Sequence, residues 1–378
     1  MNIERELLVV LNHRLHSGKA IIVLGPRQVG KTTLLRGLLQ RLEENHRWLN
    51  GDDMETRMLF REMTISKWKR LIGNAKLVVV DEAQRIENIG IKLKLVTDQL
   101  PDVQLLVSGS SSLELGDSIN EPLTGRKWQY QLYPLSFAEM QAHHGFISEN
   151  QLLSTRLVYG YYPDVVLAGG DAREVLNNLT DSYLFKDILA LEGIRKPEKL
   201  TRLLQALAYQ LGNEVSYHEL GQLVDLSSPT IENYISLLER AFIVYRLGPL
   251  SRNLRKELKT KRKIYFYDNG IRNAVIGQFG DIDHRTDIGA LWENFLLSER
   301  RKTWEYRRWY GNRFFWRTVE GQEIDYVEER DGAFHAFEFK YSPKRKVSFP
   351  PSFRKAYPEH TTAVINRGNY ADFIAPLA

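Results

Sequence analysis

Three short apolar stretches in the first third of the chain predict buried strands of a parallel sheet. They span residues 19–24, 77–80 and 103–107, and each is rich in Val, Ile and Leu. Continuous apolar runs of this length are typical of strands that are covered on both faces. From Gln151 to about Gln210 the apolar spacing becomes helical. The pattern predicts an α/β protein with a parallel sheet and flanking helices at its N-terminal end.

The first predicted strand leads directly into a phosphate-binding sequence and then into a helical pattern. Residues 25–32 read GPRQVGKT and fit G-x-x-x-x-G-K-[ST]. The glycines let successive backbone N–H groups wrap phosphates at the positive end of a helix. Lys31 is expected to reach the β- and γ-phosphates, and the Thr32 hydroxyl a magnesium ion. The predicted cofactors are ATP and Mg²⁺, and the predicted nucleotide-binding residues are Gly25, Pro26, Arg27, Gln28, Val29, Gly30, Lys31, Thr32 and Thr33.

The second and third apolar stretches end in polar residues that would complete an ATPase site. Asp81 and Glu82 follow the second stretch, at the edge of the sheet where ligands bind in doubly wound folds. We expect Asp81 to hold magnesium through water and Glu82 to polarise the attacking water. Ser108 comes first after the third stretch and would sense the γ-phosphate, with an ordinary serine-rich turn as an equal alternative. Lys31, Glu82 and Ser108 are therefore candidate catalytic residues.

Residues 216–240 have the pattern of a helix-turn-helix. Ser216 and Glu219 form a predicted capping box, and Pro229 opens a second helix after a turn at residues 225–227. Apolar strands at 241–245 and 263–267 would extend the pair into a winged helix. Glu232 and Glu239 are among the positions that this second helix would expose, and acidic residues suit phosphates poorly. A winged helix that is structural or binds protein is therefore as well supported as one that reads a DNA groove.

The C-terminal segment predicts a hairpin with charged side chains on one face. Residues 333–340 alternate strictly, so Glu338 and Lys340 share a face opposite two phenylalanines. The sequence Asp-Gly at residues 331–332 is a preferred two-residue hairpin turn. This turn would place Asp325 directly opposite Glu338.

This hairpin resembles the divalent-metal site of the restriction-endonuclease-like nucleases, in which a glutamate of the preceding helix joins an Asp and a Glu-x-Lys. The resemblance implies a second magnesium or manganese site, with Lys340 positioning water or steadying phosphate charge. Hairpins with exposed Asp, Glu and Lys are also common without any metal. The residues of this second candidate metal site are Glu293, Asp325 and Glu338.

Length and composition narrow the functional classes. The 378 residues exceed what one hydrophobic core usually supports, so we expect two or three domains. The absence of cysteine excludes disulfide scaffolds, thiolate zinc sites and cysteine nucleophiles, and it fits a reducing compartment. No apolar run approaches the ~20 residues that span a bilayer. We interpret the protein as cytoplasmic and without a membrane partner.

The net charge of +5 is modest, but the basic residues cluster in the second half of the chain. Basic residues mixed with aromatic ones suit a nucleic-acid backbone and its bases, whereas a solvated charged face is an equal alternative. The first cluster is Arg252, Arg255, Lys256, Lys259, Lys261, Arg262 and Lys263. The second is Arg300, Arg301, Lys302, Arg307, Arg308, Arg313 and Arg317, among Trp304, Tyr306, Trp309, Tyr310 and Trp316.

Nearly the whole chain resembles a family of AAA-type ATPases. The resemblance rests on GPRQVGKTT, VVVDEAQ, VSGSSSLEL, LTGRKWQYQLYPLSFAEM, YGYYPDVV, DNGIRNAV and EIDYVEERDGAFHAFEFK. It implies an oligomer in which an arginine of one subunit completes the nucleotide site of its neighbour. Arg126 is the candidate, and an ordinary structural arginine is the alternative. The implied domains are an ATPase core at 1–142, a helical region at 143–210, a winged-helix region at 211–270 and a restriction-endonuclease-like domain at 271–378.

Together these features predict an AAA-type ATPase that binds and hydrolyses ATP and associates with DNA. One alternative is a metal-dependent nuclease regulated by ATP. The other is a nucleotide-dependent switch or scaffold that binds a protein partner. DNA association would make binding fall steeply with salt, whereas the scaffold predicts no such affinity.

Overall fold

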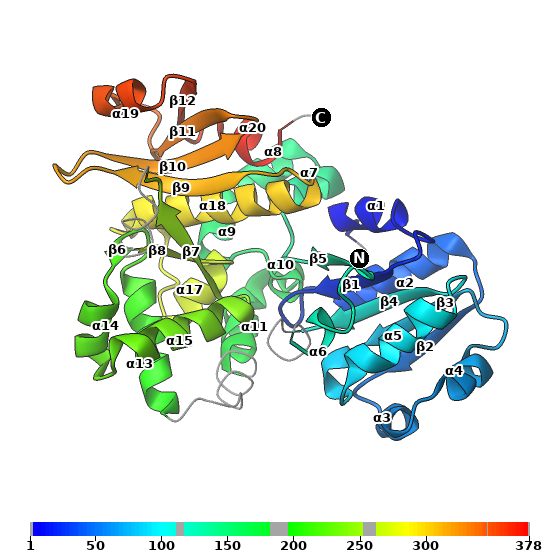
Figure 1. The fold of residues 1–378 in the computed structure, drawn as a ribbon. Coiled ribbons are helices and arrows are strands. Elements are labelled where there is room, and N and C mark those ends of the chain that lie inside the picture. Colours follow the sequence, from blue (N-terminus) through cyan, green and yellow to red (C-terminus); the bar gives the residue numbers. More distant parts are fainter. Residues whose placement is uncertain (1–2, 111–116, 182–195, 252–261, 346, 377–378) are drawn as a thin grey trace. The chain divides into compact units, whose positions relative to one another are not determined.

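The computed structural model describes residues 3–110, 117–181, 196–251, 262–345 and 347–376 (Figure 1). The chain divides into two compact units. The N-terminal unit comprises residues 1–135 with 240–242, and the C-terminal unit comprises residues 136–239 and 243–378. Across the described ranges, no helix is both long enough and apolar enough to cross a membrane.

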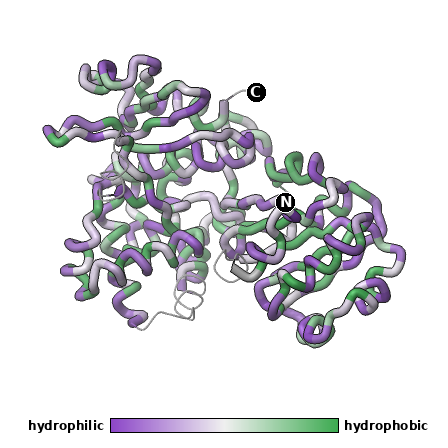
Figure 2. The backbone as a smooth tube through the Cα atoms, in the orientation of Figure 1, coloured by the Kyte–Doolittle hydropathy of each residue, from purple (hydrophilic) through white to green (hydrophobic). Residues whose placement is uncertain are grey.

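The N-terminal unit contains a five-stranded parallel sheet with the strand order β2-β3-β4-β1-β5. The strands are β1 (Ala20–Leu24), β2 (His46–Asn50), β3 (Leu77–Asp81), β4 (Gln104–Gly109) and β5 (Lys127–Gln131). The three predicted apolar stretches are β1, β3 and β4, and every residue in these strands is buried. Figure 2 shows hydrophobic stretches along this unit. The predicted parallel sheet is therefore confirmed.

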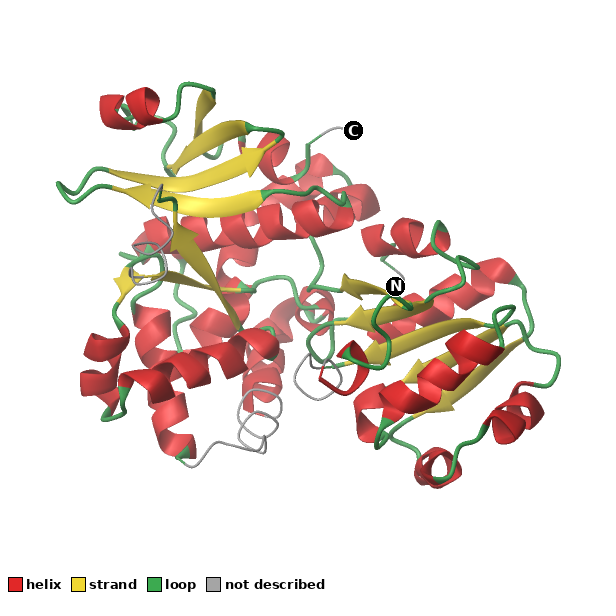
Figure 3. Ribbon diagram, viewed as in Figure 1, coloured by secondary structure: helices red, strands yellow, loops and turns green. Residues whose placement is uncertain are grey.

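Helices lie on both faces of this sheet (Figures 1 and 3). Two of them, α2 and α5, contact the central strand β4. The helices of the unit are α1 (Glu6–Asn12), α2 (Lys31–Leu42), α3 (Met54–Arg61), α4 (Ile65–Ile72), α5 (Ile89–Gln99) and α6 (Asp117–Asn120), with a 3-10 turn at Ala83–Arg85. Because β1 and β3 are both parallel neighbours of β4, their carboxyl ends meet at one edge of the sheet.

The C-terminal unit contains a mixed seven-stranded sheet with the order β12-β11-β10-β9-β7-β8-β6. Its strands are β6 (Glu214–Val215), β7 (Val244–Pro249), β8 (Arg262–Phe266), β9 (Asn312–Arg317), β10 (Glu323–Arg330), β11 (Ala333–Phe339) and β12 (His360–Ile365). Its helices are α7 (Phe137–His144), α8 (Phe146–Gln151), α9 (Leu153–Tyr159), α10 (Pro163–Leu167), α11 (Ala172–Leu179), α13 (Pro197–Tyr209), α14 (Tyr217–Val224), α15 (Ser228–Arg240), α17 (Asn269–Val275), α18 (Ile288–Tyr306), α19 (Pro351–Ala356) and α20 (Tyr370–Ile374), with 3-10 turns at Gly169–Asp171 and Ile282–His284. The protein is thus α/β throughout.

This single sheet crosses one predicted domain boundary. The strands of the proposed winged-helix region, β6 to β8, continue into β9 because β7 pairs with β9 in parallel. Residues 211–270 and 271–378 therefore share a sheet, and the boundary at residue 270 does not separate two independent sheets. The pairing depends on contacts between strands that are far apart in the sequence, which local patterns do not report.

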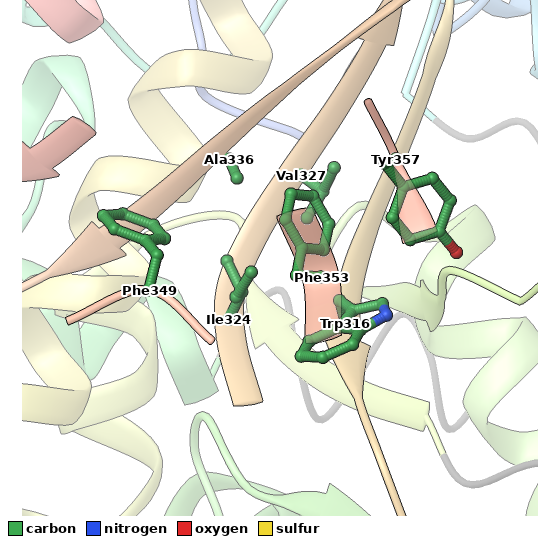
Figure 4. Close-up of a cluster of buried hydrophobic side chains, with 7 residues drawn as sticks. All are labelled: Trp316, Ile324, Val327, Ala336, Phe349, Phe353 and Tyr357. Carbon is green, nitrogen blue, oxygen red and sulfur yellow. The ribbon is translucent and has the colours of Figure 1, made fainter. Parts of the chain in front are cut away.

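The predicted C-terminal hairpin is present with the predicted register. Tyr326 pairs with Phe337 and Arg330 with Ala333, as the turn at residues 331–332 requires. Asp331 and Gly332 have φ values of 51° and 80°, and two positive φ values characterise the tight hairpin turn that Asp-Gly favours. A buried cluster under the hairpin includes Trp316, Ile324, Val327, Ala336, Phe349, Phe353 and Tyr357 (Figure 4). This core holds β9, β10, β11 and α19 together.

Candidate functional site

The predicted phosphate loop joins β1 to α2. Gly30 precedes the helix in the left-handed region, with φ of 91°, which glycine adopts at little cost. A Cβ atom on Gly25 would lie 2.1 Å from the carbonyl oxygen of Leu132, so only glycine fits against this neighbouring backbone. Val29 is buried, whereas Gln28 and Thr33 are exposed. The loop thus has the conformation that the sequence motif requires.

The side chain of Lys31 folds back into the loop. Its Nζ donates to the carbonyl oxygens of Gly25 at 3.0 Å and Pro26 at 2.8 Å, and the residue is only 4% exposed. Burial lowers the pKa of Lys31 to about 8, against the charges of Glu82 and Asp81, which raise it. When a nucleotide binds, its phosphate oxygens could replace these two carbonyl oxygens as acceptors of the hydrogen bonds from the buried ammonium.

Thr32 and Asp81 connect the phosphate loop to the end of β3. The Thr32 hydroxyl donates to Asp81 Oδ2 at 2.8 Å. Ser108, which is fully buried at the end of β4, donates to the other carboxylate oxygen of Asp81. Hydroxyl and carboxylate oxygens are the ligands that Mg²⁺ prefers, so the donor set at this point fits magnesium. The role of Ser108 as a γ-phosphate sensor stays a prediction.

Glu82 is held by Gln84, which in turn contacts Ser110, and the sequence assigned neither of these two residues a role. Gln84 Nε2 donates to Glu82 Oε2 at 2.6 Å and to Ser110 Oγ at 2.8 Å. Glu82 itself has a positive φ of 50°, a conformation that turns the chain sharply after β3. Gln84 and Ser110 lie within VVVDEAQ and VSGSSSLEL, but the sequence predicted no role for either, and the pairing of β3 with β4 brings them together.

Arg5 is a further residue of the site that the sequence did not reveal. Its guanidinium donates to the carbonyl oxygens of Val29 at 2.6 Å and Tyr133 at 2.7 Å. Arg5 therefore fastens the phosphate loop to the segment after β5. It lies 24 residues before Val29 and 128 before Tyr133, so no local signal could have identified it.

Arg126, the candidate arginine finger, has partners within its own chain. Its Nε donates to Asp98, and its Nη1 donates to the carbonyl oxygen of Thr124 at 3.3 Å. The side chain is 42% exposed. This ion pair fits the structural alternative, and the role in a neighbouring subunit stays a prediction.

The C-terminal hairpin brings Asp325, Glu338 and Lys340 together. Lys340 Nζ lies 2.8 Å from Glu338 Oε2 and 3.3 Å from Asp325 Oδ2. Asp325 Oδ2 also accepts from the backbone N–H of Phe339 at 2.8 Å. Burial and the nearby charge of Asp325 raise the pKa of Glu338. Burial opposes the charge of Lys340, yet the carboxylates of Asp325 and Glu338 raise its pKa overall.

Glu293 meets a different lysine. Lys263 Nζ lies 2.6 Å from Glu323 Oε1 and 3.4 Å from Glu293 Oε1, and the Tyr265 hydroxyl donates to Glu293. Burial raises the pKa of Glu293 to about 7, partly offset by Lys263. In the part of the chain that the structure describes, no three His, Cys, Asp or Glu side chains are placed to hold one metal ion. The sequence did not predict this contact, because Lys263 and Tyr265 belong to β8, Glu323 to β10 and Glu293 to α18, and only the tertiary fold brings these elements together.

The basic clusters differ from the interpretation based on composition. In the second cluster, Arg300 and Lys302 are buried and bonded to Glu328 and Glu299, so neither can contact a nucleic acid. The surrounding aromatics Trp304, Tyr306 and Trp316 are also buried. The prediction is therefore wrong for these five residues, because α18 is covered on nearly all sides and Trp316 of β9 belongs to the buried cluster under the hairpin. In the first cluster, Arg252, Arg255, Lys256, Lys259 and Lys261 lie outside the described residues.

Comparison with known families supports the ATPase assignment. A family model described as the AAA domain matches residues 17–141. This match and the parallel sheet with its phosphate loop support an AAA-type, nucleotide-binding ATPase in the N-terminal unit. Two domains of unknown function, DUF8612 and DUF4143, match residues 150–281 and 288–375.

Similar proteins occur in bacteria and archaea. An uncharacterised protein of Mycobacterium tuberculosis is 27% identical over 350 residues, covering 91% of this chain and 75% of the relative. One of Haemophilus influenzae is 27% identical over 285 residues, covering 68% and 70%. One of Methanocaldococcus jannaschii is 23% identical over 314 residues, covering 76% and 68%.

Two solved structures share low similarity with the chain. The Holliday junction branch migration motor of Thermotoga maritima is 16% identical and has a TM-score of 0.33, covering 68% of this chain and 95% of that one. A Pif1 helicase from Bacteroides, in complex with ADP-AlF3 and single-stranded DNA, is 18% identical with a TM-score of 0.27, covering 42% and 50%. At these scores no function is transferred from either protein.

Proposed function

We propose that the N-terminal unit binds ATP with magnesium and hydrolyses it. The observation that carries the proposal is the 2.8 Å hydrogen bond from Thr32 to Asp81, which joins the phosphate loop to the acidic end of β3. A hydroxyl and a carboxylate that already meet there can share the coordination sphere of one magnesium ion, which would neutralise phosphate charge.

The remaining groups have complementary roles in this proposal. The backbone N–H groups of the loop and the start of α2 bind the phosphates, and Lys31 exchanges its two carbonyl partners for phosphate oxygens. Glu82 orients the attacking water and accepts its proton. Gln84 fixes the Glu82 carboxylate through its 2.6 Å hydrogen bond, so Gln84 is a positioning residue.

The test is ATP turnover by the wild type, Lys31→Ala and Glu82→Gln. Each variant has a matched control at an exposed position of the same unit, namely Lys94→Ala and Glu87→Gln. We expect turnover to fall at least about a hundredfold in both site variants and to stay unchanged in both controls. Glu82→Gln should still bind ATP, because Glu82 acts on water rather than on the phosphates. Wild-type turnover equal to that of both site variants would refute the proposal.

DNA association remains a prediction. The structure has two helices, α14 and α15, joined by a short turn at residues 225–227, and Asp225 ends α14 in the left-handed region. Ser216 caps α14 by accepting from the N–H of Glu219. These features support the predicted helix-turn-helix. Turnover should be measured with duplex, single-stranded and branched DNA. Stimulation by one form that weakens with salt would favour DNA, and indifference to all of them would favour a protein partner.

A metal-dependent nuclease is the second candidate, and the convergence of Asp325, Glu338 and Lys340 favours it. Lys263 counts against it, because its ammonium lies 3.4 Å from Glu293, one of the expected ligands, and would repel a metal cation there. The test is cleavage of the same DNA forms with Mg²⁺ or Mn²⁺ by the wild type and Glu338→Ala. Cleavage that the variant lacks would support nuclease function, and no wild-type cleavage would remove it.

A further inference from the structure

A cavity of about 200 Å³ lies in the C-terminal unit where β7 and β9 come apart. The two strands pair only through Gly248 with Phe314 and Pro249 with Phe315. The residues that precede these pairs line the cavity from both strands. This volume is enough for a tetrahedral oxyanion and some water. Its polar lining includes Tyr245, Arg246, Arg301, Asn312, Arg313 and Tyr326.

The lining carries positive charge without an acidic residue of its own. Glu239, which lies outside the lining, neutralises Arg246, whose Nε donates to Glu239 Oε2 at 2.7 Å. Arg313 has no carboxylate partner among the described residues, and its guanidinium lies 5.2 Å from the centroid of the Trp304 ring. Arg301 lies 4.7 Å from the centroid of the Tyr245 ring. The guanidinium of Arg313 therefore leaves the cavity with a positive charge that no described carboxylate balances, and Arg301 adds a second guanidinium to the lining.

The hydroxyl of Tyr245 adds an independent observation. Tyr245 is 5% exposed, and its hydroxyl is buried without a hydrogen-bond partner in the described part of the chain. Buried hydroxyl groups are almost always hydrogen-bonded, so a lone one beside a cavity points to a ligand or water that accepts from it. An anion that accepts from this hydroxyl and from Arg313 would give the hydroxyl its missing partner and balance the charge of Arg313.

We propose that this cavity binds a phosphoryl group. A guanidinium presents N–H donors in a fork that matches the oxygens of phosphate, and a tetrahedral oxyanion has enough oxygens for two arginines and a hydroxyl. The group can come from a free phosphate or small phosphoester, or from the terminal phosphate of a nucleic acid. The site is separate from the phosphate loop, because all of its lining residues belong to the C-terminal unit.

The decisive experiment locates an oxyanion directly. Crystals of the full-length wild type, saturated with a non-hydrolysable ATP analogue to occupy the phosphate loop, are soaked in selenate. We expect an anomalous selenium peak within hydrogen-bonding distance of Arg313 and Arg301. If crystals soaked in saturating selenate show no anomalous peak in the cavity, the proposal is overturned, whether or not the phosphate loop binds nucleotide.

A calorimetric titration of inorganic phosphate into the same analogue-saturated protein gives the second measurement. Arg313→Gln should weaken phosphate binding at least about tenfold, because it removes a charge-assisted hydrogen bond. Arg354→Gln, at an exposed position of α19, should leave it unchanged. Equal affinities in the two variants would contradict the proposal. If Arg313→Gln does not fold, as judged by circular dichroism, the wild-type crystal decides.

The two sources are distinguished by competition. An oligonucleotide with a 5′-phosphate is compared with the same oligonucleotide ending in a 5′-hydroxyl, each displacing inorganic phosphate. Displacement by the phosphorylated strand alone identifies a nucleic-acid end as the ligand. Displacement by adenosine monophosphate but by neither strand identifies a small phosphoester. Both results support a phosphoryl site. If the strand with a 5′-hydroxyl displaces phosphate as well as the strand with a 5′-phosphate does, the site does not recognise a terminal phosphate, and the proposal is contradicted.

Discussion

Removing the guanidinium of Arg300 should destabilise the C-terminal unit without changing any affinity for DNA. Arg300 and Glu328 form a buried ion pair, with Arg300 Nε and Nη2 donating to the two carboxylate oxygens at 2.7 and 2.9 Å. Arg300 Nη1 also donates to the carbonyl oxygen of Phe373 at 2.5 Å. Arg300→Met would leave the fully buried Glu328 with Trp304, at 2.8 Å, and the Arg330 guanidinium, at 3.2 Å.

The expected loss is about 3–5 kcal/mol, the range for breaking a buried ion pair by removing one partner. Although burial favours the neutral carboxyl, Arg300 lowers the pKa of Glu328 in the folded chain. The pair's stabilisation is therefore present above the unfolded pKa of glutamate, about 4.3, and is lost as the pH falls through the lower folded value. Arg300→Met should be much less sensitive to pH in this acidic window.

The assay is urea unfolding followed by circular dichroism at pH 7 and pH 4, with Arg354→Met as the exposed control. The same variants are tested for salt-dependent DNA binding. A free energy of unfolding within about 1 kcal/mol of the wild type at pH 7 would refute the structural role of the ion pair. If Arg300→Met remains fully folded but loses affinity for DNA, Arg300 would instead be a nucleic-acid contact.

Three further predictions concern Gly25, Lys31 and Glu293. Gly25→Ala should destabilise the N-terminal unit by about 1–3 kcal/mol in urea unfolding and abolish ATP binding, because its Cβ meets the Leu132 carbonyl at 2.1 Å. Gly37→Ala in α2, whose Cβ would make only an ordinary 3.9 Å contact with Leu8 of α1, should stabilise the unit by up to about 1 kcal/mol, and equal effects of the two substitutions would contradict this contrast. Because the pKa of Lys31 is about 8, ATP binding at pH 8.5 should take up a proton that calorimetry in two buffers detects, whereas Lys31→Arg should show none. Burial raises the folded pKa of Glu293 to about 7, so its protonated form stabilises the fold at low pH and this contribution, up to about 3 kcal/mol, is lost as pH rises through 7. Unfolding at pH 5 and pH 8 should show a smaller decline for Glu293→Gln than for the wild type, and an identical decline would rule out Glu293 as its source.

Where the sequence pattern was local, it predicted the structure in detail. The register of the C-terminal hairpin followed from Asp331 and Gly332, because a two-residue turn determines which residues face each other. The contact between Asp325, Glu338 and Lys340 then followed from side-chain alternation. The phosphate loop could be predicted equally well, because its glycines, lysine and threonine lie within one short segment between a buried strand and a helix.

Charge counted along the sequence was a poor guide to the surface. Arg300 and Lys302 resembled part of a basic, aromatic patch, yet both are buried against Glu328 and Glu299. Glu328 is 28 residues from Arg300, so the partner that neutralises the charge is invisible in the local pattern. For the same reason, the local pattern did not show that Lys263 lies beside Glu293. Its ammonium changes which ions the acidic residues there can bind.

By itself, the sequence determined the features that depend on neighbours in the chain, namely the parallel α/β class, the phosphate loop, the acidic pair after β3 and the hairpin turn. Tertiary structure alone decided which distant groups meet: Arg5 with the phosphate loop, Gln84 with Ser110, and Arg301 with Arg313 around one cavity. The physical reason is that backbone geometry and hydrophobic periodicity act over a few residues, whereas burial and ion pairing depend on the packing of the whole unit.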